Sequence, residues 1–167
     1  MEPQRTARLY YLKILRLKGD PQSLARGMTV GVAIGIIPIL PLQTLTILIC
    51  APLFKGNSIA AVLAGLLVSN PLTLIPQYYI CCKLGKLLYP IDLSWSRVRG
   101  TVEYMLSGSA SWGEQLAALS LLGYESLAVM ILGGVILAIP LALITYPLSL
   151  RLFLAIQRKR RQKHILS

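Results

Sequence analysis

Uncharged polar residues inside two otherwise apolar stretches are the side chains of this chain best suited to binding chemistry. They are Gln43, Thr44, Asn70, Thr73 and Gln77. Each stretch also carries prolines that break a helix, since proline lacks an amide donor and clashes with the preceding turn. These are Pro38, Pro41, Pro71 and Pro76. The half-helix after such a break begins with partial positive charge, which favours an anionic group such as a lipid phosphate. We therefore predict a substrate-binding site at the breaks.

Groups suited to catalysis or to metal binding are sparse. The chain has six Asp and Glu residues in total, one histidine (His164) in a basic tail, and no nucleotide-binding glycine loop. Its three cysteines, Cys50, Cys81 and Cys82, lie in apolar stretches without Cys-x-x-Cys spacing. We expect no enzymatic activity, no metal, no cofactor and no disulfide framework.

The elements that carry the polar residues have the composition of membrane helices. Charged residues make up 14% of the chain, against roughly 25% in soluble domains. Three long stretches lack any charge: Gly27 to Phe54, Gly56 to Cys82, and Ser126 to Leu150. Each exceeds the ~18 apolar residues that indicate a membrane-spanning helix. The sequence therefore predicts an all-α integral membrane protein with a single membrane domain over residues 21–156.

The first two stretches predict proline-broken helices over residues 24–54 and 58–89. In lipid, irregular backbone survives only where protein buries it or where it lines a polar cavity. Paired broken helices indicate a binding site near the membrane midplane, with re-entrant hairpins whose tips meet there. The alternative is that the prolines only kink through-going helices, with Gln43 and Asn70 satisfying the freed carbonyls. Both interpretations remain open at this point.

The remaining segments predict a membrane surface on either side of this domain. Residues 1–20 form a basic amphipathic interfacial helix, and residues 157–167 a basic cytoplasmic tail. Residues 90–115 form an interfacial linker, with Trp95 and Trp112 at headgroup level. Residues 116–156 form either one span or a hairpin that turns near Gly133 and Gly134 or at Pro140. The hairpin would put Glu125 inside the bilayer, where a carboxylate is costly and usually functional.

Charge and small residues indicate orientation and partners. The formal charge is +11 and is concentrated near both ends of the chain. The positive-inside rule then predicts that both termini are cytoplasmic, next to anionic lipid headgroups, and nucleic-acid binding is not expected. The spacing of Gly27, Gly31 and Gly35 predicts close helix packing, within the chain or between subunits. Because so small a number of helices cannot fully enclose a binding site, we expect a homo-oligomer or a membrane partner.

Several motifs resemble one bacterial family. They are the segment from Gly35 to Thr44, the Asn-Pro-x-Thr motif within Ser69 to Tyr79, the Leu84-Gly85 pair, and the entry segment Arg16 to Pro21. They are similar to the membrane-domain family named domain of unknown function 2062, most clearly between Leu9 and Tyr89. The resemblance implies the bacterial inner membrane and no particular activity. The domain also occurs joined to some sugar transferases, which implies lipid-linked substrates.

Two functional hypotheses follow. The first is transport or handling of a small anionic or lipid-linked substrate at a midplane site between the two broken helices. The second is a non-catalytic scaffold or accessory subunit of a membrane assembly. A break that water can reach, at Gln43 and Asn70, favours the first hypothesis. A dry, fully packed break favours the second.

Overall fold

The computed structural model describes residues 17, 19–40, 42–89, 94–106 and 111–165. These residues form helices without any strand, which confirms the predicted all-α class. The helices are α2 (Pro21–Ile36), α3 (Gln43–Leu53), α4 (Ser58–Val68), α5 (Pro71–Leu88), α6 (Trp95–Leu106), α7 (Trp112–Leu121) and α8 (Tyr124–Ile165). The amphipathic helix predicted over residues 1–20 lies almost entirely outside the described residues.

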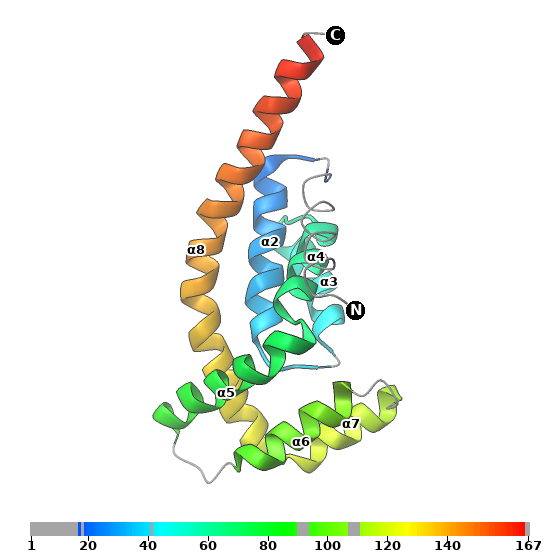
Figure 1. Ribbon diagram of the computed structural model, residues 1–167, viewed down its shortest axis with the longest axis vertical. Coiled ribbons are helices and arrows are strands. Elements are labelled where there is room, and N and C mark those ends of the chain that lie inside the picture. Colours follow the sequence, from blue (N-terminus) through cyan, green and yellow to red (C-terminus); the bar gives the residue numbers. More distant parts are fainter. Residues whose placement is uncertain (1–16, 18, 41, 90–93, 107–110, 166–167) are drawn as a thin grey trace.

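Helices α2, α3 and α4 form a compact three-helix unit (Figure 1). Helix α2 begins at Asp20, whose carboxylate accepts the Ser23 amide at 3.0 Å, with proline as its first residue. Helix α3 runs back alongside α2, so that the Asn57 amide reaches the Ser23 carbonyl at 2.9 Å. Helix α4 runs parallel to α2. The first broken element is therefore a helical hairpin, with both ends on one side of the unit.

The glycines of α2 allow this close approach. A Cβ added at Gly31 would collide with the Ala61 carbonyl of α4, and one added at Gly27 would collide with the Asn57 carbonyl. Gly35 lies at Gly65 in the same register. The predicted small-residue stripe thus packs inside the chain, against α4, where only hydrogen side chains leave room for the neighbouring backbone.

Helix α8 is continuous over 42 residues and runs antiparallel to α2. Leu24 near the start of α2 packs in one cluster with Phe153, and Ile36 at its end packs in another with Ala138. The chain does not turn back near the glycine pair or at Pro140. The glycines serve packing instead, because a Cβ at Gly133 would meet the α5 backbone and one at Gly134 would meet Pro38.

The second broken element does not form a hairpin. Helix α5 leaves α4 at an angle of 86° and crosses α8, with Gly85 against Val129. Helix α6 packs on α5 through Val98 and Val102. Helix α7 then lies beside α6, and Gly123, with a φ of +81°, leads into α8. Figure 1 shows α6 and α7 lying across the lower end of the molecule.

One segment among the described residues, Tyr124–Arg160, has the length and hydropathy of a membrane span. The bent pair Ser58–Val68 and Thr73–Leu88 has them only if the pair counts as one span. Helix α3 is apolar but short. The segment 116–156 thus corresponds to one long helix, preceded by most of α7. Glu125 lies exposed in its first turn.

Candidate functional site

The two breaks meet at the C-terminal end of α2, in a polar junction formed by Gly35, Ile36, Gln43, Ser69 and Gln77. The Gln43 side-chain amide donates to the Ser69 hydroxyl at 2.6 Å, and that hydroxyl donates to the Gly35 carbonyl at 2.8 Å. Gln43 is the first residue of α3, and Ser69 directly follows α4. This hydrogen-bond chain therefore joins three helix ends.

Helix α5 contributes the third side chain of the junction. The Gln77 amide donates to the carbonyls of Gly35 and Ile36, at 2.8 and 3.0 Å, and the Cys81 thiol lies 3.7 Å from the Ile36 carbonyl. The last carbonyls of a helix lack intrahelical partners. Here Ser69 and two side chains of α5 supply partners for the last two carbonyls of α2.

The junction is well buried. Gln43 is 6% exposed and Gln77 is 9% exposed. Apolar side chains of the adjoining helices, such as Ile36 and Ala138, pack beside it. Burying an amide is costly unless it is hydrogen-bonded, and both side-chain amides have partners: the Gln43 amide donates to the Ser69 hydroxyl and the Gln77 amide to two carbonyls. The chemistry that this geometry supports is structural: it fixes the two breaks against each other.

Thr73 closes the second break separately. Its hydroxyl accepts the Asn70 amide at 3.1 Å and lies 2.6 Å from the Val68 carbonyl and 2.9 Å from the Asn70 carbonyl. It therefore serves both the end of α4 and the start of α5, in the manner of a local side-chain cap. Thr73 is exposed, and its bonds are all local.

Four of the five predicted site residues thus fall into two groups. Gln43 and Gln77 meet at the junction, whereas Asn70 and Thr73 form the neighbouring turn. Thr44 is exposed on α3 and takes no part in the junction.

The predicted helix-breaking prolines also differ from one another. Pro38 is buried in the first break, and Pro71 begins α5. Helix α5 continues through Pro76, so this proline does not end a helix. Pro41 lies outside the described residues.

Two residues of the breaks were not among the predicted site residues. Ser69 bridges Gln43 and Gly35, and its place directly before the Asn-Pro pair is the signal that marks it. Tyr78 follows Gln77 and is 3% exposed. Its hydroxyl faces the Leu40 backbone but has no hydrogen bond of normal geometry among the described residues. A buried hydroxyl without a partner is unusual, so Tyr78 is the polar group of the breaks that is left to interact with something else.

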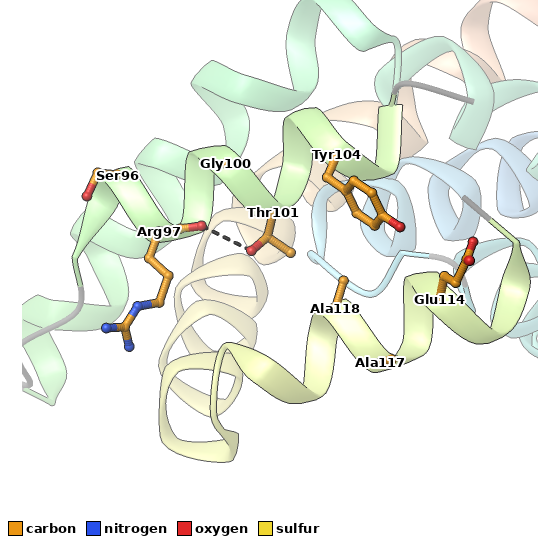
Figure 2. Close-up of a pocket in the computed structure, with 8 residues that line it drawn as sticks. All are labelled: Ser96, Arg97, Gly100, Thr101, Tyr104, Glu114, Ala117 and Ala118. Carbon is orange, nitrogen blue, oxygen red and sulfur yellow. Dashed lines mark hydrogen bonds between the residues drawn. The ribbon is translucent and has the colours of Figure 1, made fainter. Parts of the chain in front are cut away.

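A second candidate site is an open groove of about 520 Å³ between α6 and α7 (Figure 2). Among the lining residues in Figure 2, Arg97 and Glu114 lie toward opposite ends of the groove, with Tyr104 and Ala118 between them. Glu114 belongs to a capping box at the start of α7, where it accepts the Ser111 amide at 2.7 Å. These hydrogen bonds from Ser111 lower the pKa of Glu114. The carboxylate is thereby engaged in starting α7.

Comparison with known proteins gives a family and no activity. No curated protein and no solved structure matches this chain significantly. The model of one family, described as an uncharacterized protein conserved in bacteria (DUF2062), matches residues 4–162. The match extends through α8, well beyond the segment in which the motifs are clearest, and the chain therefore belongs to the DUF2062 family.

Proposed function

We propose that this protein is a non-catalytic scaffold of the bacterial inner membrane, with α8 and the bent α4–α5 pair as its two crossings. The α2–α3 hairpin enters and leaves the membrane on one side, and both termini are cytoplasmic. Helices α6 and α7 lie at the outer surface and are held there for a membrane partner. The observation that carries the scaffold function is the closed, buried hydrogen-bonding of the polar junction.

Exposed apolar side chains support insertion into lipid. Only 28% of the apolar stretch of α8 is buried, whereas the core helix of a soluble protein is mostly buried. Leu143 and Leu148 of α8 and Leu53 of α3 are 72%, 60% and 72% exposed. Monomeric soluble proteins rarely expose apolar surface on this scale. Lipid covers such a surface without the cost of contact with water.

Helix lengths support the re-entrant arrangement. At 1.5 Å per residue, the 11 residues of α3 and the 11 of α4 each extend about 16 Å, half of a ~30 Å hydrocarbon core. The uncharged part of α8, Ser126 to Leu150, is about 37 Å long, and Ala138 is its midpoint. Because Ala138 packs with Ile36, the polar junction lies at the depth of the bilayer centre.

Charges support the orientation. Basic side chains gather where α2 begins and α8 ends, with Asp20 as the acidic residue there: Arg26, Lys55, Arg151, Arg158, Lys159 and Arg160. The opposite end is nearly balanced, with Lys83, Lys86, Arg97 and Arg99 against Glu103, Glu114 and Glu125. The positive-inside rule assigns the first end to the cytoplasm. The hairpin gives an even number of crossings without a second span in residues 116–156.

The junction supports a scaffold over a transporter. A transport site needs polar groups that exchange partners with a substrate. Here the Gln77 amide already caps the end of α2, and the Gln43 amide is already bonded to the Ser69 hydroxyl. Breaking those bonds at the bilayer centre would leave carbonyls without partners, at a cost of about 1–3 kcal/mol each. The junction therefore favours one fixed arrangement of the breaks.

Site-directed labelling tests the topology. Asn57→Cys, in a background without the three native cysteines, should react with a membrane-impermeant maleimide from the cytoplasmic side. Ser111→Cys, at the start of α7, is the matched control and should react from outside. Labelling of both positions from the same side, or of position 57 from outside, would overturn the proposed arrangement.

Substrate handling is the second candidate function, and the unpartnered Tyr78 hydroxyl is the observation that favours it. A small anion or lipid phosphate that accepts a hydrogen bond from this hydroxyl would lie beside the junction. Gln43→Cys separates the two functions through its reaction with a charged thiosulfonate, with Lys55→Cys as a reactive surface control. A scaffold leaves position 43 unreactive. Rapid modification there would show that water reaches the break, and it would favour substrate handling.

A further inference from the structure

A small cavity between α5 and α6 has the chemistry of an anion site. Its volume is about 160 Å³, and its lining residues are Tyr79, Cys82, Lys83, Lys86 and Trp95. One water molecule takes ~30 Å³ in the liquid, so a phosphate group has room there. Four of the five residues follow the i, i+3, i+4, i+7 spacing of one face of α5, and Trp95 begins α6.

The aromatic wall of the cavity is built by two helices. The rings of Tyr79 and Trp95 meet edge to face, with centroids 5.1 Å apart. This pair holds the start of α6 against α5. The start of a helix carries partial positive charge, and the start of α6 therefore has the same sign as the two lysines of α5.

Lysine positions distinguish this cavity from an ordinary helix end. Lys86 lies in the last turn of α5, where a lysine compensates the negative end of the helix dipole. Lys83 lies about a turn earlier, beyond the range of that effect. It has no acidic partner within the part of the chain that the structure describes. Two cations on one cavity wall repel each other, and an anion between them removes the repulsion.

The depth of the cavity corresponds to lipid headgroups. Gly85 lies against Val129 of α8, about 6 Å along the helix from Glu125, where the uncharged stretch begins. Lysines at that depth extend their amino groups toward the surface, and tryptophan prefers the same level.

We propose that this lysine–aromatic cavity binds a phosphate group at the outer membrane surface, from an anionic phospholipid headgroup or from free phosphate. The proposal rests on the membrane arrangement given under the proposed function. It adds a specific outer-face ligand site, distinct from the general attraction of the basic cytoplasmic end for anionic lipid.

Fluorescence energy transfer from Trp95 to a labelled lipid tests whether the cavity binds a phosphate headgroup. The full chain with Trp112→Phe retains Trp95 as its only tryptophan. This variant is reconstituted in two preparations of phosphatidylcholine vesicles. One contains a trace of phosphatidylglycerol with a dansyl label on its acyl chain, and the other contains a trace of phosphatidylcholine labelled in the same way. We expect several-fold stronger transfer to the labelled phosphatidylglycerol. The double substitution Lys83→Gln, Lys86→Gln should remove most of this preference, leaving about equal transfer to the two labelled lipids. The control Arg97→Gln, Arg99→Gln removes the same formal charge from α6, outside the lining of the cavity, and should preserve the preference.

A detergent arm identifies free phosphate. Sodium phosphate is titrated against sulfate-free protein in micelles while Trp95 emission is recorded. A saturable change that requires the lysines, without any lipid preference in vesicles, supports the site with free phosphate as its ligand. A lysine-dependent lipid preference without that change supports the lipid headgroup. No response in either arm, or equal loss in both double variants, overturns the proposal.

One further variant, and the independence of the two tests, keep these outcomes interpretable. Lys83→Arg conserves the charge and should keep the response, which separates charge from misfolding. The detergent arm needs no bilayer, and labelling at position 57 does not involve the cavity. Failure of the topology and failure of the phosphate site are therefore distinguishable.

Discussion

The Gln77 side-chain amide donates to the Gly35 carbonyl at 2.8 Å, which joins the middle of α5 to the end of α2 across 42 residues of sequence. A second bond from the same amide reaches the Ile36 carbonyl at 3.0 Å. Both carbonyls belong to the last turn of α2, where backbone carbonyls lack helical partners. Gln77 thus connects the second broken element to the point at which the first one reverses.

Replacing Gln77 with leucine should destabilise the protein by about 1–3 kcal/mol, because the Ile36 carbonyl is left with only the distant Cys81 thiol. The measurement is denaturant unfolding of the full chain in mild detergent. Thr44→Val, on the exposed face of α3, is the control and should change the free energy of unfolding by less than about 0.5 kcal/mol. Equal effects of the two substitutions would contradict the capping role.

Gln43 and Ser69 should behave as one unit in a double-mutant cycle. Gln43→Leu and Ser69→Ala each break the same chain of hydrogen bonds to Gly35. Once one of them is present, the other should therefore lower the free energy of unfolding by less than it does alone. We expect a coupling energy of about 0.5–3 kcal/mol. Thr44→Val combined with Ser69→Ala should be additive. Additivity of the Gln43 and Ser69 substitutions would mean that the bridge contributes nothing to stability.

The sequence predicts the positions of the breaks better than their geometry. Proline and asparagine mark the interruptions after Ile36 and after Val68, because their backbone chemistry is local. Whether the chain then reverses or bends by 86° depends on packing against α8, which local sequence does not encode. Gly133 and Gly134 suit a turn by composition, but their missing side chains instead let α8 pass close to α5 and Pro38.

The candidate site shows the same division. Amides in an apolar stretch were recognisable as residues with a polar task, and Gln43 and Gln77 do meet. The partners of Gln77 are backbone carbonyls of α2, which carry no sequence signal at all. Ser69 joins the site only because α2 and α4 run in parallel, a tertiary relationship. Thr44 is exposed because of how α3 is rotated about its own axis. So apolar a helix has no clear pattern of polar and apolar residues from which that rotation could be predicted.

Glycine substitutions test the contact between α2 and α4. A Cβ at Gly31 collides with the Ala61 backbone carbonyl, which cannot move aside as a side-chain end can. Gly31→Ala should therefore cost roughly 1–3 kcal/mol. Gly100→Ala in α6 is the matched control, since open space surrounds that position. It should be neutral or stabilise by about 0.5–1 kcal/mol, because alanine favours helix more than glycine. Similar losses at both positions would contradict the close approach.

The start of α7 should become less protected as the solution is acidified. Hydrogen bonds from the Ser111 amide and hydroxyl hold the pKa of Glu114 below its ordinary value of 4.5. A carboxyl whose pKa is lower in the folded state contributes stability above its unfolded pKa and loses it as the pH falls through the folded value. Amide exchange at Ser111 and the first turn of α7 should therefore be slow near neutral pH. After correction for intrinsic exchange rates, it should quicken below about pH 4.5.

Glu114→Gln provides the comparison for that experiment. Glutamine at this position can still accept the Ser111 amide through its neutral oxygen, but it does not titrate. The variant should show weaker protection near neutral pH, because the hydrogen bond to a charged acceptor is the stronger one, and its protection should not change with acidification. If the corrected protection in the parent chain also stayed constant between pH 6 and pH 3, the capping box would not depend on the carboxylate charge. The start of α7 would then be held by its contact with α6 alone.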